Sequence, residues 1–248
     1  MNVVAIETSG QEVGVALGEG PVPPRLLAVQ RYRIGPRHAE LLTPMLAQVL
    51  ETCSLVPKDI EAVLVDAGPG LLSGLRVGVA TAKALAWAVG AKVVAVSSLD
   101  VLAFQARREG PLVAVADARK GELYWAFYQG MERSGAPKVG PVSEAVAQTR
   151  EWLDAGAGAA VAVGDGVLRY AEEFADIPGL LIGSGEDATV SVEAVFALGC
   201  RKLDLEGGIE ARELLPTYLR PPDAKVNFAV GIEGGGSTPV SQPEEPSK

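Results

Sequence analysis

Apolar and polar residues follow two different patterns along the first third of the chain. VVAIET and VGVALGEG are short apolar runs on either side of the turn-like SGQE, and RLLAVQRYRI is a third run, so the chain is predicted to open with antiparallel strands. HAELLTPMLAQVLETCSL instead spaces its apolar residues three and four apart, which is typical of one face of a helix. Pro44 either starts this helix behind Thr43 or kinks it.

A buried strand and an apolar helix come next. IEAVLVDAG is apolar enough for a strand covered on both faces, DAGPGLLSGLR contains a turn, and VGVATAKALAWAVGA is rich in small residues. KVVAVSS predicts a further strand, so this half alternates strand and helix. Within the turn we expect Gly70 to supply conformational freedom and Pro69 to supply stiffness.

The pattern begins again after a helical stretch around LDVLAFQARR. IETSGQEVGVAL aligns without a gap with ADARKGELYWAF, so Glu7 falls on Asp117 and Glu12 on Glu122. We interpret this match as a duplicated, hairpin-led domain, with chance similarity as the alternative. EWLDAGAGAAVAVGDGV indicates a helix end and a strand, and SVEAVFALGCRKLDL a closing helix.

These elements predict two domains and a tail. The first domain is expected to span residues 1–100 and to include the closing helix at about 189–206, and the second, smaller domain to span residues 101–188. Residues 226–248 are rich in Gly, Pro and Ser, and we expect them to form a disordered tail.

The glycines of DAGPGLLSGLR match no nucleotide-binding motif. No Walker A lysine is present, and Gly68, Gly70 and Gly74 are spaced one residue too widely for a dinucleotide fingerprint. A helix N-terminus with Arg76 nearby attracts anions, but many structural turns do the same. We therefore interpret the loop as a corner rather than a phosphate site.

The helix after this loop is apolar on nearly every side. Gly74, Gly78, Ala82 and Ala86 recur every fourth residue and make a shallow stripe that another helix can approach closely. A helix of this kind must be covered all round. The cover is either the core of this chain or a second chain.

Composition limits the partners. The net charge of -9 disfavours independent binding to nucleic acid, and the local exception is the cluster Arg31, Arg33 and Arg37. No basic leader precedes the first apolar run, no run reaches membrane-spanning length, and Cys53 and Cys200 lie far apart. We expect a soluble, cytoplasmic protein with reduced thiols and no membrane contact.

Long segments in a fixed order resemble the bacterial TsaB (YeaZ) family throughout residues 1–225: HAELLTPML, GPGLLSGLRVGVATAKALAWAVGAKVVAVSSLD, VADARKGELYWAFY, VAVGDGVLRY and LLPTYLR. The resemblance implies an α/β fold of duplicated actin-like, Hsp70-like domains (ASKHA, ribonuclease H-like) with mixed sheets flanked by helices. It also implies a role in making threonylcarbamoyladenosine beside the tRNA anticodon.

The resemblance implies partners as well. These are TsaD, the related subunit that transfers the threonylcarbamoyl group, the ATPase component TsaE, and a second copy of the chain as a homodimer. Contact with tRNA is then expected only indirectly through the complex, and contact with ATP or ADP only within it. In that family the two helices described above make both the self-dimer and the TsaD contact, which here selects Leu41, Met45, Gly74, Leu75, Gly78, Val79 and Ala82.

Two features favour a subunit without catalytic or metal-binding residues. TsaD-like proteins hold a metal with a histidine pair one helical turn apart, but His38 is the only histidine in this sequence and is expected at a helix start or an interface. Actin-like ATPases place a glycine two residues after the first hairpin's acid, where this chain has Ser9 after Glu7.

No intrinsic cofactor is predicted, and the candidates for nucleotide contact are few. Besides Glu7 and Ser9 they are Gly164 and Gly166, which resemble a remnant of the adenosine-side turn or else form a plain turn from strand to helix.

Three hypotheses follow. The leading one is a non-catalytic scaffold that supports TsaD together with TsaE. The second is an autonomous enzyme, either an actin-like ATPase or kinase or a metal-dependent threonylcarbamoyl transferase. The third, a direct tRNA-binding module, is disfavoured by the net charge.

Overall fold

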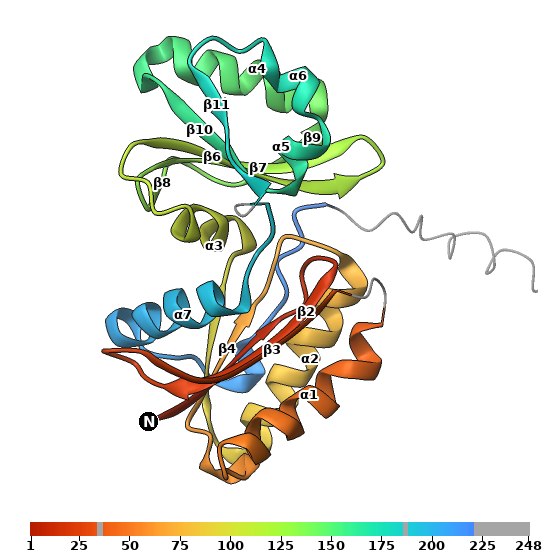
Figure 1. Cartoon of the computed structure of the whole chain (residues 1–248), viewed down its shortest axis with the longest axis vertical. Coiled ribbons are helices and arrows are strands. Elements are labelled where there is room, and N and C mark those ends of the chain that lie inside the picture. The colour runs from red at the N-terminus through yellow and green to blue at the C-terminus, as the bar shows by residue number, and fades with distance from the viewer. Residues whose placement is uncertain (34–36, 186–187, 221–248) are drawn as a thin grey trace, which may run out of the picture.

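Two β-sheets, each flanked by helices, lie one above the other along the long axis of the molecule (Figure 1). This computed structural model describes residues 1–33, 37–185 and 188–220, and the tail predicted at 226–248 lies outside these residues. The α/β class with mixed sheets flanked by helices is confirmed. The domain limits at residues 100 and 188 stay a prediction.

The first sheet has the strand order β3-β2-β1-β4-β5. An antiparallel meander is formed by β1 (Asn2–Glu7), β2 (Glu12–Glu19) and β3 (Arg25–Arg33), and β4 (Ala62–Asp66) and β5 (Lys92–Val96) run parallel to β1. The apolar runs of β1 and β4 are buried on both faces, as expected for central strands between two helix layers.

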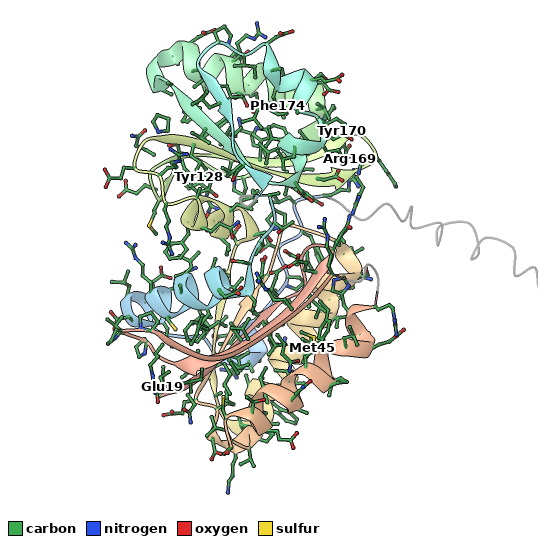
Figure 2. All side chains as sticks on the ribbon, in the orientation of Figure 1. Glu19, Met45, Tyr128, Arg169, Tyr170 and Phe174 are labelled. Carbon is green, nitrogen blue, oxygen red and sulfur yellow. The ribbon has the colours of Figure 1, made fainter. Side chains whose placement is uncertain are left out.

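Helices α1 (His38–Thr52) and α2 (Leu72–Val89) cover one face of this sheet, and α7 (Val192–Glu206) covers the other (Figure 1). Figure 2 shows Met45 between α1 and the rest of the domain, in keeping with its exposed fraction of 2%. Pro44 lies inside α1, so the alternative in which it starts the helix is wrong.

The second sheet has the order β11-β10-β6-β7-β8, with β9 also paired to β7. Its strands are β6 (Pro111–Arg119), β7 (Glu122–Gln129), β8 (Glu132–Arg133), β9 (Lys138–Pro141), β10 (Ala160–Val163) and β11 (Leu180–Ile182). It repeats the plan of the first sheet, because an antiparallel hairpin is followed by strands parallel to its first member. The predicted duplication is confirmed.

Helices also cover both faces of the second sheet. On one face lie α4 (Val142–Trp152), α5 (Asp165–Arg169) and α6 (Ala171–Ala175), and on the other lies α3 (Ser98–Gln105) (Figure 1). Between residues 1 and 220, apart from 34–36 and 186–187, the structure contains no helix both long and apolar enough to cross a membrane.

Candidate functional site

The loop between β4 and α2 is a corner held by the chain itself. The Gly68 amide donates a hydrogen bond to Asp66 Oδ1 at 2.8 Å, and the Leu71 amide donates to the Ser9 carbonyl at 2.7 Å. Gly68 has φ +105°, which favours glycine, whereas Gly70 has no positive φ. A Cβ on Gly70 would lie 2.4 Å from the Ser9 carbonyl oxygen. The conformational freedom predicted at Gly70 therefore belongs to Gly68, and Gly70 permits close contact with the β1–β2 turn.

The shallow stripe on α2 is filled by this same turn. A Cβ on Gly74 would lie 2.0 Å from the Thr8 carbonyl oxygen, and one on Gly78 would lie 2.2 Å from Thr8 Oγ1. Thr8 Oγ1 also donates a hydrogen bond to the Gly74 carbonyl at 2.9 Å. The glycines are explained by the packing of a turn of this chain, and no second helix is required.

The residues predicted for the association surface lie on the core side of their helices. Leu41 is half-buried, and the other six are buried: Met45, Gly74, Leu75, Gly78, Val79 and Ala82. Those six residues are covered by other parts of this chain. The association surface at these residues stays a prediction, and the side of α2 that is exposed to solvent is the opposite one.

We call that opposite side the outer face of α2 and define it as Ser73, Ala80, Ala84 and Trp87, all of which are exposed. Trp87 is 82% exposed, unusual for the largest apolar side chain. A tryptophan beside small residues is the kind of anchor that dominates protein interfaces. The outer face of α2 is therefore the candidate docking surface.

A pocket of about 220 Å³ lies between the two sheets. Ser9, Gly10 and Gly70 line it from the first domain, and Asp117, Arg119 and Arg169 line it from the second. Figure 2 shows Arg169 at the edge of the second domain that faces the first. Of the four predicted nucleotide-contact residues, Glu7 and Ser9 line this pocket.

Glu7 and Asp66 end the neighbouring parallel strands β1 and β4 behind the pocket. The amide and hydroxyl of Ser9 donate to Glu7 Oε1 at 2.7 and 2.6 Å. The Gly68 amide and the Ser98 hydroxyl donate to Asp66 Oδ1, each at 2.8 Å. One oxygen of each carboxyl group is thus satisfied by the surrounding turns.

The other two oxygens, Glu7 Oε2 and Asp66 Oδ2, are buried, and no donor within the described part of the chain reaches them. Burial and then the negative charge of Asp66 raise the pKa of Glu7 well above its ordinary value, and burial raises the pKa of Asp66. Ionisation of Glu7 beside Asp66 is therefore disfavoured in the folded protein.

The acid on the second wall of the pocket is also paired. Asp117, whose side chain is 4% exposed, forms ion pairs with Arg119 at 3.2 Å and Arg169 at 3.1 Å. The Asp117 amide donates to Asp165 Oδ1 at 2.9 Å, and burial raises the pKa of Asp165. Asp117 on the second wall is therefore engaged by the chain itself.

Gly164 and Gly166 are explained by packing against β6. Gly164 has φ +109°, and a Cβ there would lie 2.1 Å from the Val115 carbonyl oxygen. A Cβ on Gly166 would lie 2.8 Å from the Ala116 carbonyl carbon. Neither lines the pocket between the sheets. The interpretation as a plain turn from strand to helix accounts for both glycines, and nucleotide contact stays a prediction.

His38 is the first residue of α1 and is buried, with Nε2 3.1 Å from the Glu12 carbonyl oxygen. Within residues 1–33, 37–185 and 188–220, no group of three or more His, Cys, Asp or Glu side chains is placed to hold a metal ion. Sequence reasoning expected this histidine at a helix start, and it lies there.

The candidate basic cluster is largely neutralised. Arg31 pairs with Glu193 at 3.5 Å, and Arg37 pairs with Glu40 at 2.8 Å. Arg33 lines the pocket instead of extending the cluster. Two of the three arginines are thus paired with acids, and the third lines the pocket.

Comparison with known proteins gives consistent matches. Residues 33–193, more than half of the chain, match the family described as TsaD, tRNA N6-adenosine threonylcarbamoyltransferase. The tRNA threonylcarbamoyladenosine biosynthesis protein TsaB of Bacillus subtilis is 34% identical over 130 residues, which cover 52% of this chain and 56% of that protein. The TsaB protein of Escherichia coli is 29% identical over 234 residues, which cover 89% of this chain and 95% of that protein.

A solved structure agrees with these matches. YeaZ from Pseudomonas aeruginosa is 28% identical and superposes with a TM-score of 0.72, covering 88% of this chain and 100% of that one. The likeness confirms the predicted actin-like, duplicated fold.

Proposed function

This chain belongs to the TsaB (YeaZ) family, and we propose that in tRNA threonylcarbamoyladenosine biosynthesis it is the non-catalytic partner of TsaD. Membership of the family supports a role in that pathway. In the proposed role the chain binds and supports TsaD, TsaE joins the assembly, and the transfer chemistry takes place on TsaD.

One observation supports the non-catalytic role above the others. Glu7 Oε1 accepts two hydrogen bonds from Ser9, burial and the neighbouring carboxylate disfavour ionisation of Glu7, and Asp117 is held by two arginines. A general base needs a free lone pair within reach of a substrate, and a metal site needs several unprotonated ligands. The solitary His38, bound to a backbone carbonyl, supplies neither.

The outer face of α2 supports a docking role. Trp87 is exposed beside Ala80 and Ala84, so a partner helix has room to approach α2 around a single large anchor. We infer that TsaD and a second copy of this chain use this one surface, so the homodimer and the heterodimer compete. Contact with tRNA is then made through the complex, and ATP or ADP is bound only in that complex.

The family match favours a second candidate function. Residues 33–193 match the family described by the name of the transferase itself, so an autonomous threonylcarbamoyl transferase is the alternative. The two candidates differ in what the purified chain does without TsaD.

The test is a reconstitution with purified components. We expect this chain to copurify with TsaD and TsaE, and we expect tRNA to be modified only when TsaD is present. Omission of this chain should lower the rate of modification. Modification by this chain in the absence of TsaD would overturn the proposal and favour the transferase, and failure to copurify with TsaD would overturn the docking role.

A further inference from the structure

The last described segment, residues 211–220, crosses from the first domain to the second. We propose that it is a strap that couples α2 to the β6–β7 turn and sets how far the pocket between the sheets opens. Figure 1 shows the segment in blue, running beside β4 and α2 toward the second sheet.

The first part of the strap is fixed on α2. It begins with the short helix η4 (Ala211–Glu213), and Ala211 and Leu214 are buried in the core beneath α1 and α2. Lys83 Nζ donates to the carbonyl oxygens of Arg212 and Leu214 at 3.0 and 3.2 Å. Hydrogen bonds from an ammonium group are stronger than those between neutral groups, so Lys83 is the main polar tie between α2 and the strap.

The middle of the strap rests on the corner that forms the first wall of the pocket. The Thr217 amide donates to the Ala67 carbonyl at 2.7 Å, and Arg76 Nε donates to Tyr218 Oη at 3.3 Å. The Thr217 carbonyl oxygen lies 3.1 Å from the position of a Cβ on Gly68. Gly70, two residues beyond Gly68, lines the pocket.

The end of the strap is fixed on the second wall. Leu219 packs against the core beneath α3, and Arg220 Nη1 donates to the Ala118 carbonyl at 3.3 Å. Arg220 also forms an ion pair with Glu122. Ala118 and Glu122 flank the β6–β7 turn, whose Arg119 lines the pocket.

These contacts give the strap a mechanical role. Residues 215–219 belong to no helix or strand, and they join a point fixed on α2 to a point fixed on the β6–β7 turn. A segment of fixed length held at both ends limits the separation of its two attachment points. When the strap leaves α2, the turn loses that limit and the pocket opens.

The coupling has a consequence for partners that rests on the proposed docking role. Arg76, Ala80, Lys83 and Trp87 are spaced four, three and four residues apart, so they share one side of α2. A partner bound around Trp87 would therefore press on the two side chains that hold the strap. Hydrogen exchange measured on the full chain alone tests the coupling independently of docking.

The test is hydrogen exchange in Lys83→Met, read at the β6–β7 turn, which Lys83 does not contact. We expect exchange at residues 118–122, and at residues 9–12 on the opposite wall, to accelerate several-fold and at most about tenfold, as for the loss of a charge-assisted hydrogen bond. Arg220→Gln, which cuts the other end, should have the same effect. Lys58→Met makes the same change at an exposed lysine away from the strap and should have none.

Faster exchange confined to α2 and the strap in Lys83→Met, with the turn at its original rate, would overturn the proposal. If Lys83→Met does not fold, Tyr218→Phe is the milder variant, because it removes one hydrogen bond and leaves the ring in place. Tyr218→Phe should accelerate hydrogen exchange at the β6–β7 turn. An unchanged exchange rate at that turn in this variant would likewise overturn the proposal.

Discussion

Glu7 and Asp66, 59 residues apart in the sequence, lie at the carboxyl ends of adjacent parallel strands, where burial raises the pKa of both carboxyl groups. The pair stabilises the turns on the first wall of the pocket and makes their stability depend on pH. Because burial raises both pKa values, the folded protein keeps a proton that the unfolded chain releases near pH 4.

The sign of the pH dependence follows. Stability from the pair is fully present below the unfolded pKa and is lost as pH rises toward the raised folded pKa. Glu7→Gln keeps an acceptor for Ser9 and cannot ionise, so it should become more stable relative to the original chain as pH rises above about 4, the ordinary pKa of a carboxyl group. The limiting slope is ~1.4 kcal/mol per pH unit for one proton.

Urea unfolding of the two proteins across this range measures the difference. Glu51→Gln, at an exposed position of α1, is the matched control and should track the original chain. A difference between Glu7→Gln and the original chain that stays constant with pH would contradict a raised pKa of Glu7 in the folded protein.

Gly78→Ala distinguishes packing within the chain from packing against a second helix. The added Cβ meets Thr8 Oγ1 at 2.2 Å, so we expect a loss of about 1 to 3 kcal/mol in the free energy of unfolding. Gly110→Ala has no atom within 4 Å of its new Cβ and should change stability little. Thermal or urea unfolding gives the sign of the change in the free energy of unfolding for Gly78→Ala. A loss supports packing against Thr8, because an unobstructed alanine inside a helix would instead stabilise the protein by up to ~1 kcal/mol.

Trp87→Glu tests the outer face of α2. Since Trp87 is 82% exposed, the free energy of unfolding should change by less than about 0.5 kcal/mol. Self-association and binding to TsaD, measured by sedimentation, should both weaken by a factor of about 30 or more, as for a central interface residue. Leu181→Glu, an exposed position on β11, is the control. Unaltered association in Trp87→Glu would place the contact elsewhere.

The purified chain should not turn over ATP. Ser9 occupies the position where actin-like ATPases need glycine, and its amide and hydroxyl are already bound to Glu7. A coupled phosphate-release assay on the chain alone should give the background rate. Steady turnover that Glu7→Ala abolishes would refute the expectation.

The longer elements could be predicted from the sequence, because their hydrophobic periods are strong. Helix α1, the central strands and the hairpin that opens each domain all follow from local patterns. The short β9, β11, α5 and α6 could not be predicted this way, since elements of three to five residues show no clear period and are held by pairing or packing with distant segments.

The candidate site was less predictable for a physical reason. A stripe of small residues indicates that another backbone segment comes close, but it does not identify that segment. Here the segment is the β1–β2 turn at Thr8. The alignment with Asp117 made Glu7 a candidate residue, whereas no sequence pattern pointed to Asp66. The sequence does show that each of the two acids ends an apolar run typical of a buried strand. The acids become neighbours only if those two strands pair in parallel.

The most direct test of the central claim is the initial rate of threonylcarbamoyladenosine formation in tRNA, measured with TsaD, TsaE and variants of this chain. If the chain is a non-catalytic partner that docks through α2, Glu7→Gln will support the same rate as the original chain and Trp87→Glu will support a much lower one. Loss of the reaction with Glu7→Gln, together with a full rate for Trp87→Glu, would contradict the account.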